Sequence, residues 1–144
     1  MKAPIHLVHR YENRVLAGLD PSDEMGYALA LDKLWSVHLN DQNGLKYDQD
    51  KSFASENLRR AFNQVRVLEE NGYGKNGEFI GLDVKVMRTQ PRDMAFKHLE
   101  NSKKMFHRLV EKVRTYDKEK ERQFIAARDY EGLDWHVLEH LMGR

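Results

Sequence analysis

Two aspartates, Asp48 and Asp50, lie one residue apart in the segment LKYDQD. The segment follows VHLN, which has the character of a buried strand, and DQNG, which has the composition of a turn. Two carboxylates at the end of a strand are either solvated loop acids or ligands of a positive charge. The rest of the sequence has to distinguish these two interpretations.

The composition indicates one domain of ordinary size. The chain has 144 residues, with 24 Lys and Arg, 23 Asp and Glu, a formal charge of +1 and no Cys. This balance offers no basic face for nucleic acid, and the first ten residues lack the apolar core of a secretory signal. No apolar run approaches the roughly 18 residues of a membrane helix. We therefore expect no nucleic-acid partner, no membrane partner and a cytoplasmic location.

Three segments predict strands that alternate with helices. The strands are residues 4–10, 34–40 and 78–87, with helices over 22–34 and 55–72 between them and only helix after Pro91. Such alternation is typical of βαβ units with parallel strands, but three strands alone leave two open edges. We therefore interpret the chain as α/β, with the C-terminal part of a (β/α)8 barrel over residues 1–90 and a C-terminal helical tail over residues 91–144.

Capping residues set the expected ends of the helices. Ser22 or Asp23 is expected to cap the first helix, Ser55 the second and Asp134 the last. Gly72 and Gly143 stand where a left-handed residue ends a helix.

Period-two alternation brings polar side chains to the carboxyl ends of the strands. On the second strand His38 and Asn40 share one face, and on the third Asp83 and Lys85 do. In βα barrels that end holds the active site. We expect His38, Asp83 and the two loop aspartates to converge there around Mg²⁺, Mn²⁺ or Co²⁺, because inward-facing carboxylates need pairing or a metal. We assign Asn40 and Lys85 to substrate binding.

Each of these residues also has a structural interpretation. Asp83 and Lys85 would form an ion pair within one strand, and Asp48 and Asp50 would be exposed loop acids. A lone histidine such as His38 is more often a core residue than a ligand. The glycine-rich GYGKNG segment follows a helix and precedes a strand, which is the reverse of a phosphate loop, so it predicts a turn.

The segment HLNDQNGLKYDQD, followed about thirty residues later by GLDVKVMR, resembles the C-terminal part of the xylose isomerase family. The resemblance runs from LAGLD to the final LEHLMG. It implies a (β/α)8 barrel, two divalent metals, a tetramer and interconversion of an aldose with a ketose by hydride transfer. It also implies that Asp48 and Asp50 bind the second, catalytic metal and that Asp83 binds the first.

The sequence departs from the family at several ligand positions. His38 stands where typical members have an aspartate, and Arg10 and Asn13 stand where they have a glutamate and a histidine. The ring-opening histidine and the catalytic lysine of the family would lie upstream. We therefore expect a C-terminal fragment that is inactive alone, completed by a homo-oligomer or a complementary barrel fragment and acting on a small-molecule sugar.

Two other functions stay open from the sequence. One is a non-catalytic sugar-binding or assembly protein derived from the same barrel, which Arg10 and Asn13 favour. The other is an isomerase or epimerase of another sugar, with the metal site reshaped around His38.

Overall fold

The computed structural model describes residues 7–9, 15, 17–46 and 48–143. Their elements are, in order, β1 (Leu7–His9), α2 (Pro21–Ala30), β2 (Leu34–Leu39), α3 (Leu58–Glu70), β3 (Phe79–Leu82), a 3₁₀ turn (Arg92–Met94), α4 (Lys97–Thr115), α5 (Lys118–Ala127) and α6 (Tyr130–Met142). The expected alternation followed by helices is thus confirmed. The start of the first predicted strand, Arg10 and Asn13 lie outside the described residues.

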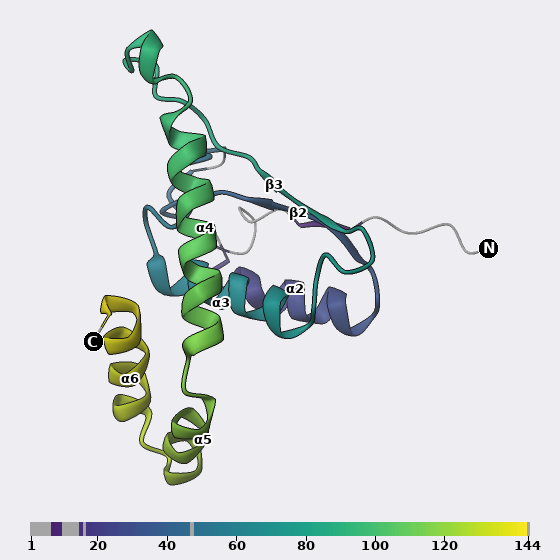
Figure 1. The fold of residues 1–144 in the computed structure, drawn as a ribbon, viewed down its shortest axis with the longest axis vertical. Coiled ribbons are helices and arrows are strands. Elements are labelled where there is room, and N and C mark those ends of the chain that lie inside the picture. Colours follow the sequence, from purple (N-terminus) through teal and green to yellow (C-terminus); the bar gives the residue numbers. More distant parts are fainter. Residues whose placement is uncertain (1–6, 10–14, 16, 47, 144) are drawn as a thin grey trace, which may run out of the picture.

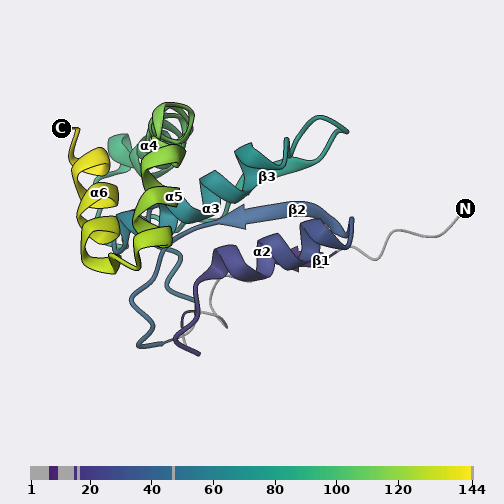
Figure 2. The same ribbon diagram turned by 90° about the horizontal axis from the view of Figure 1, so that it is seen from below.

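The three strands form a parallel sheet in the order β1–β2–β3. The helices α2 and α3 lie side by side on one face of this sheet (Figures 1 and 2). Neither of these two helices covers the opposite face, which is the face that would line the interior of a barrel. The chain is therefore α/β with parallel strands, and most of its elements are helices.

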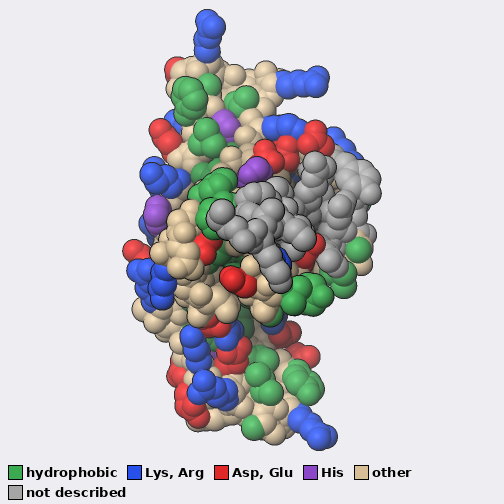
Figure 3. Space-filling view, turned by 90° about the vertical axis from the view of Figure 1, so that its right-hand side faces the viewer, with side chains coloured by type: hydrophobic (Ala, Val, Ile, Leu, Met, Phe, Trp, Pro, Cys, Tyr) green, Lys and Arg blue, Asp and Glu red, His purple; other side chains and the backbone are tan. Residues whose placement is uncertain are grey.

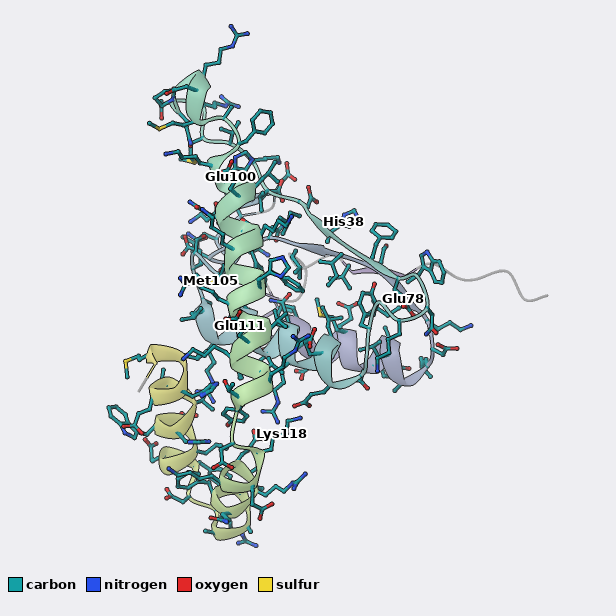
Figure 4. All side chains as sticks on the ribbon, in the orientation of Figure 1. His38, Glu78, Glu100, Met105, Glu111 and Lys118 are labelled. Atoms are coloured by element: carbon teal, nitrogen blue, oxygen red, sulfur yellow. The ribbon has the colours of Figure 1, made fainter. Side chains whose placement is uncertain are left out.

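The core lies between the sheet and the two helices. Val37 and Leu39 of β2 are fully buried, as are Met25 of α2 and Phe62 and Val65 of α3. The alternation of the second strand predicts one apolar face of Trp35, Val37 and Leu39, and the structure buries Val37 and Leu39 but leaves Trp35 42% exposed. The burial of Val37 and Leu39 orients His38 toward the face opposite the helices, as Figure 4 shows.

The third strand is shorter than predicted. It ends at Leu82, whereas the alternation of residues 78–87 predicts a strand up to Met87. The Asp83 amide still donates to the Leu39 carbonyl, but the Lys85 amide donates to the Asp50 carbonyl at 2.7 Å. Beyond Asp83 the chain therefore leaves the sheet, because it bonds to the loop after β2 and not to β2 itself.

The predicted helix starts are wrong by a few residues, for a common reason. The observed N-caps are Asp20 for α2, Asn57 for α3 and Asp129 for α6, and each side chain accepts a backbone N–H of the first turn. Asp and Asn compete with Ser for this role, so short runs rich in all three leave the cap ambiguous. Asp134 instead pairs with Arg59 of α3 at 2.7 Å. The predicted stops are confirmed, because Gly72 and Gly143 are both left-handed.

The C-terminal helices dock on α3. Tyr116, which follows α4, contacts the Phe62 ring edge-on at 5.6 Å between centroids. Arg66 of α3 lies over the Tyr116 ring and makes a bidentate pair with Glu121 of α5, at 2.6 and 2.7 Å. Burial raises the pKa of the Tyr116 hydroxyl to about 12, so this side chain stays neutral at physiological pH.

One buried carboxylate fixes the loop that follows β2. The Asp41 side chain is buried, with 1% exposed. Its Oδ2 accepts hydrogen bonds from the amides of Glu56 and Asn57, at 2.9 and 3.0 Å. Its Oδ1 accepts a hydrogen bond from the amide of Gln42 at 2.8 Å. Its backbone also forms an antiparallel bridge with Lys51. Asp41 thus closes the loop of residues 42–50 at its base and holds the start of α3.

We predict that Asp41→Ala lowers the free energy of unfolding by about 3 kcal/mol, because it leaves buried amides without a charged acceptor. The measurement is urea denaturation followed by circular dichroism. Asp93→Ala, an exposed aspartate in the 3₁₀ turn, is the control and should change stability by less than about 0.5 kcal/mol. Equal effects of the two substitutions would contradict the role given to Asp41.

Candidate metal and substrate site

The predicted site residues gather where β2 and β3 end. Asn40 and the loop of Asp48 and Asp50 follow β2, and Asp83 and Lys85 follow β3. Because the two strands are parallel and adjacent, their carboxyl ends lie at one edge of the sheet. The predicted convergence of these segments is therefore present at the level of the fold.

Lys85 joins the two loop aspartates. Its Nζ lies 2.6 Å from Asp48 Oδ2 and 2.6 Å from Asp50 Oδ2, and it also reaches the Asp48 carbonyl at 3.4 Å. The side chain of Asp48 is largely exposed, whereas that of Asp50 is only 4% exposed. The two aspartates are thus neither a pair of free loop acids nor equivalent to one another.

The burial of Asp50 is compensated on both oxygens. Asn40, itself 5% exposed, donates its Nδ2 to Asp50 Oδ1 at 2.9 Å, while Lys85 holds Oδ2. A buried carboxylate is costly unless it is paired and hydrogen-bonded, and these two contacts supply that compensation. The sequence assigns Asn40 and Lys85 to substrate binding. In the structure both side chains contact Asp50.

The loop backbone carries local strain at this pair. Asp48 and Asp50 both have positive φ, at 61° and 43°. Left-handed conformations are uncommon for residues other than glycine and cost of order 1 kcal/mol or more each, although Asp tolerates them better than most. Such strain concentrates at functional sites. Here the ion pairs with Lys85 help to stabilise the left-handed backbone of Asp48 and Asp50.

His38 and Asp83 form a second, looser pair. Their Nδ1 and Oδ2 atoms are 3.9 Å apart, which is too long for a hydrogen bond but leaves room for a bridging water or ion. Both side chains are substantially exposed. Gly81 lies opposite His38 in the strand register, so no side chain of β3 separates the imidazole from its neighbour strand.

Lys85 therefore pairs with the loop and not with Asp83, so the alternative of a strand ion pair between Asp83 and Lys85 is wrong. The reason is the early end of β3, which turns the Lys85 backbone and side chain toward Asp48 and Asp50. Within the described ranges, no three His, Cys, Asp or Glu side chains are grouped closely enough to hold a metal ion. The site thus consists of two separate donor pairs.

The ammonium of Lys85 changes the protonation of its partner. Its hydrogen bond and its charge hold the pKa of the Asp48 carboxyl below the ordinary value of 3.8. The hydrogen bonds that the ammonium donates to the two carboxylates in turn raise the pKa of Lys85 above its usual range. Both groups are therefore charged across the physiological pH range, and the contact is an ion pair throughout it.

Sequence reasoning missed two contributors to this region. Asp41 was read as part of a turn, and its contacts with residues 56 and 57 come from a loop closure that no local pattern reveals. The basic side chains of Lys46 and Arg88 border the site. In the sequence Lys46 shortly precedes Asp48, and Arg88 shortly follows Asp83. Their proximity to these aspartates was a signal that could have been used.

Three curated relatives, all named xylose isomerase, align with the chain. The protein of Thermus thermophilus is 30% identical over 118 residues, which cover 81% of this chain and 30% of that protein. The protein of Streptomyces lividans is 41% identical over 78 residues, 54% of this chain and 19% of that protein. The protein of Thermus caldophilus is 29% identical over 140 residues, 91% of this chain and 35% of that protein.

These alignments confirm the resemblance that the acidic motifs indicate. The chain is similar to xylose isomerases, and it spans about a third or less of the length of these curated relatives. No family model matches it. Among the described residues, no helix combines the length and apolar character that a bilayer crossing requires.

We predict that Lys85→Gln raises the pKa of the Asp48 carboxyl toward 3.8, because the substitution removes the charge that lowers it. A group with a lowered native pKa stabilises the fold above its unfolded pKa and loses that contribution as the pH falls through the native value. Carboxyl ¹³C NMR titration of the variant and the unaltered protein measures the shift. An unchanged Asp48 titration would contradict the assigned ion pair.

Proposed function

We propose that this chain forms the C-terminal part of a xylose-isomerase-type (β/α)8 barrel and carries part of a metal-dependent aldose–ketose isomerase site. The similarity across 81% of the chain and the parallel βα order support this proposal. So does the position of α2 and α3 on one face of the sheet, because a closed barrel would enclose the other face. On this reading, residues 1–90 belong to the barrel and residues 91–144 to a helical tail.

The observation that carries the proposal is the Lys85 ammonium held between Asp48 and Asp50. An ammonium lies 2.6 Å from each carboxylate, so the two acids already converge on one positive charge. Oxygen donors of this kind suit Mg²⁺ or Mn²⁺, with Co²⁺ also acceptable, and His38 with Asp83 offers a second donor pair. The donor types therefore suit a hard divalent cation in the place of the Lys85 ammonium, and its remaining ligands would come from outside the described residues.

Each residue then has a defined task. Asp48 and Asp50 hold the cation, and Asn40 orients Asp50 by donating to its other oxygen. If a divalent ion bound there, Lys85 would give up its contacts with the two carboxylates, and its ammonium would be free to donate to a sugar hydroxyl. A bound metal would polarise the oxygens of the sugar as a Lewis acid. The groups that open the ring and move protons would come from the other strands of the barrel, so we expect no turnover by this chain alone.

A second candidate function rests on a different feature of the same contact. Lys85 neutralises the aspartate pair without a metal, and the described residues contain no group of three metal ligands. A sugar-binding or assembly protein that has lost catalysis would have this arrangement. Arg10 and Asn13, at positions where the family resemblance implies ligands, favour the same candidate.

We predict that Asp48→Asn with Asp50→Asn weakens Mn²⁺ binding at least tenfold, because the two substitutions remove both anionic donors from one site. Isothermal titration calorimetry measures the affinity. Asp32→Asn with Asp93→Asn removes the same charge from two exposed aspartates away from the site and is the matched control. Equal Mn²⁺ affinity in both double variants would remove the metal site from the proposal.

Turnover separates the two candidates. The isomerase proposal expects xylose–xylulose conversion, or that of another aldose, only when the remaining barrel strands are supplied in the same or another polypeptide, and expects Asp48→Asn with Asp50→Asn to abolish it. Absence of conversion in a completed barrel would favour the non-catalytic candidate.

The tail offers a surface for a homo-oligomer or a complementary barrel fragment. Figure 3 shows hydrophobic side chains among charged ones at the end of the molecule where α5 lies. Across α5 and α6 the large apolar side chains left exposed are Ile125, Tyr130, Trp135, Leu138 and Met142. Exposed apolar side chains in this number on two neighbouring helices are typical of an interaction surface.

We predict that Ile125→Glu with Trp135→Glu weakens self-association at least tenfold, because it places two charges on that surface. Sedimentation velocity over a range of concentrations measures the association constant. Tyr27→Glu, on an exposed position of α2, is the control. An unaltered protein that sediments as a monomer at all concentrations, with or without added barrel segments, would contradict the assembly.

A further inference from the structure

A cavity of about 590 Å³ opens next to the aspartate pair. One wall comes from the loop of residues 46–55, the other from residues 85–90 after β3, and His98 near the start of α4 closes one end. Ligand pockets for small molecules typically have this size. Lys85 belongs both to this wall and to the contact with Asp48 and Asp50, so the cavity and the candidate metal site are contiguous.

The lining of this cavity is strongly one-sided in charge. Lys46, Lys51, Lys85 and Arg88 line it, and among the residues that the structure describes no Asp or Glu does. Lys51 pairs with Glu56, and Lys85 pairs with Asp48 and Asp50. Within the part of the chain that the structure describes, no salt bridge engages Lys46 or Arg88. Both side chains are therefore available to an anion.

The remaining polar groups of the lining are mostly hydrogen-bond donors of the kind that bind oxyanions. Ser52, Ser55 and Thr89 contribute hydroxyl groups. His98 adds an imidazole whose Nδ1 is buried and has no hydrogen-bond partner among the described residues. A buried polar atom of this kind is uncommon unless water or an ion satisfies it. Arg, Lys and hydroxyl groups together are the usual surroundings of a phosphate or carboxylate.

We propose that this cavity binds the anionic group of an acidic sugar, either a phosphate or a carboxylate, while the sugar oxygens face Asp48 and Asp50. Binding of the anionic group rests on the cavity alone, whereas the orientation of the sugar oxygens toward Asp48 and Asp50 rests on the proposed function. The substrate class would then be a sugar phosphate or a sugar acid and not a neutral sugar. The contiguity of the two sites through Lys85 is what lets one small ligand reach both.

The test compares ribose, ribose 5-phosphate and glucuronate by isothermal titration calorimetry in metal-free buffer. We expect ribose 5-phosphate or glucuronate to bind at least tenfold more tightly than ribose, and the tighter of the two identifies the anionic group. Binding should weaken as salt is added, because the contacts are charge-assisted. Equal affinity for the neutral and both anionic sugars would overturn the proposal.

The variant test uses Lys46→Gln with Arg88→Gln. We expect it to weaken binding of the preferred anionic sugar more than about tenfold, since charge-assisted contacts are roughly twice as strong as neutral ones. Lys103→Gln with Lys104→Gln removes the same charge from exposed positions of α4 outside the cavity and should leave that affinity unchanged. Equal losses in the two double variants would also overturn the proposal.

The two proposals fail separately. If Asp48→Asn with Asp50→Asn leaves Mn²⁺ binding intact but anionic sugars still outbind ribose, the metal site is wrong and the anion cavity stands. If Mn²⁺ binding depends on the aspartates but anionic sugars have no advantage, the cavity proposal alone is wrong.

Discussion

The ammonium of Lys85 between Asp48 and Asp50 is the interaction on which the site depends. It neutralises a carboxylate that is nearly inaccessible to water, and it joins the loop after β2 to the chain after β3. The Lys85 amide makes the same connection through the Asp50 carbonyl. Two aspartates with strained backbones are therefore held together by one residue that follows another strand.

The fold presents this contact at one place for simple reasons. Burial of Val37 and Leu39 against α2 and α3 sets which side chains of β2 face away from the helices. Parallel pairing of β2 with β3 brings their carboxyl ends together, and Asp41 ties the intervening loop to the start of α3. The helices that follow pack on α3 through Tyr116 and Arg66.

Local patterns in the sequence predicted the elements, whereas contacts between segments were harder to foresee. The alternation of β2 correctly placed Val37, Leu39 and His38, because a buried strand imposes period two on its own residues. The same reasoning extended β3 to Met87, because apolar alternation continues there after the chain has left the sheet. It also proposed a pair between Asp83 and Lys85, where the actual partners of Lys85 lie 35 and 37 residues earlier in the chain. Loop closure by a buried carboxylate such as Asp41 leaves no periodic trace.

The central claim is that Asp48 and Asp50 form a cation site for which Lys85 is the resident charge. A crystal structure of the protein soaked with Mn²⁺, with anomalous scattering collected for that ion, tests it most directly. The account predicts an anomalous peak about 2.0–2.6 Å from carboxylate oxygens of both aspartates, the distance range of hard divalent cations, with the Lys85 ammonium displaced. Lys85 still seated between the two carboxylates at saturating Mn²⁺, with no peak beside them, would contradict it.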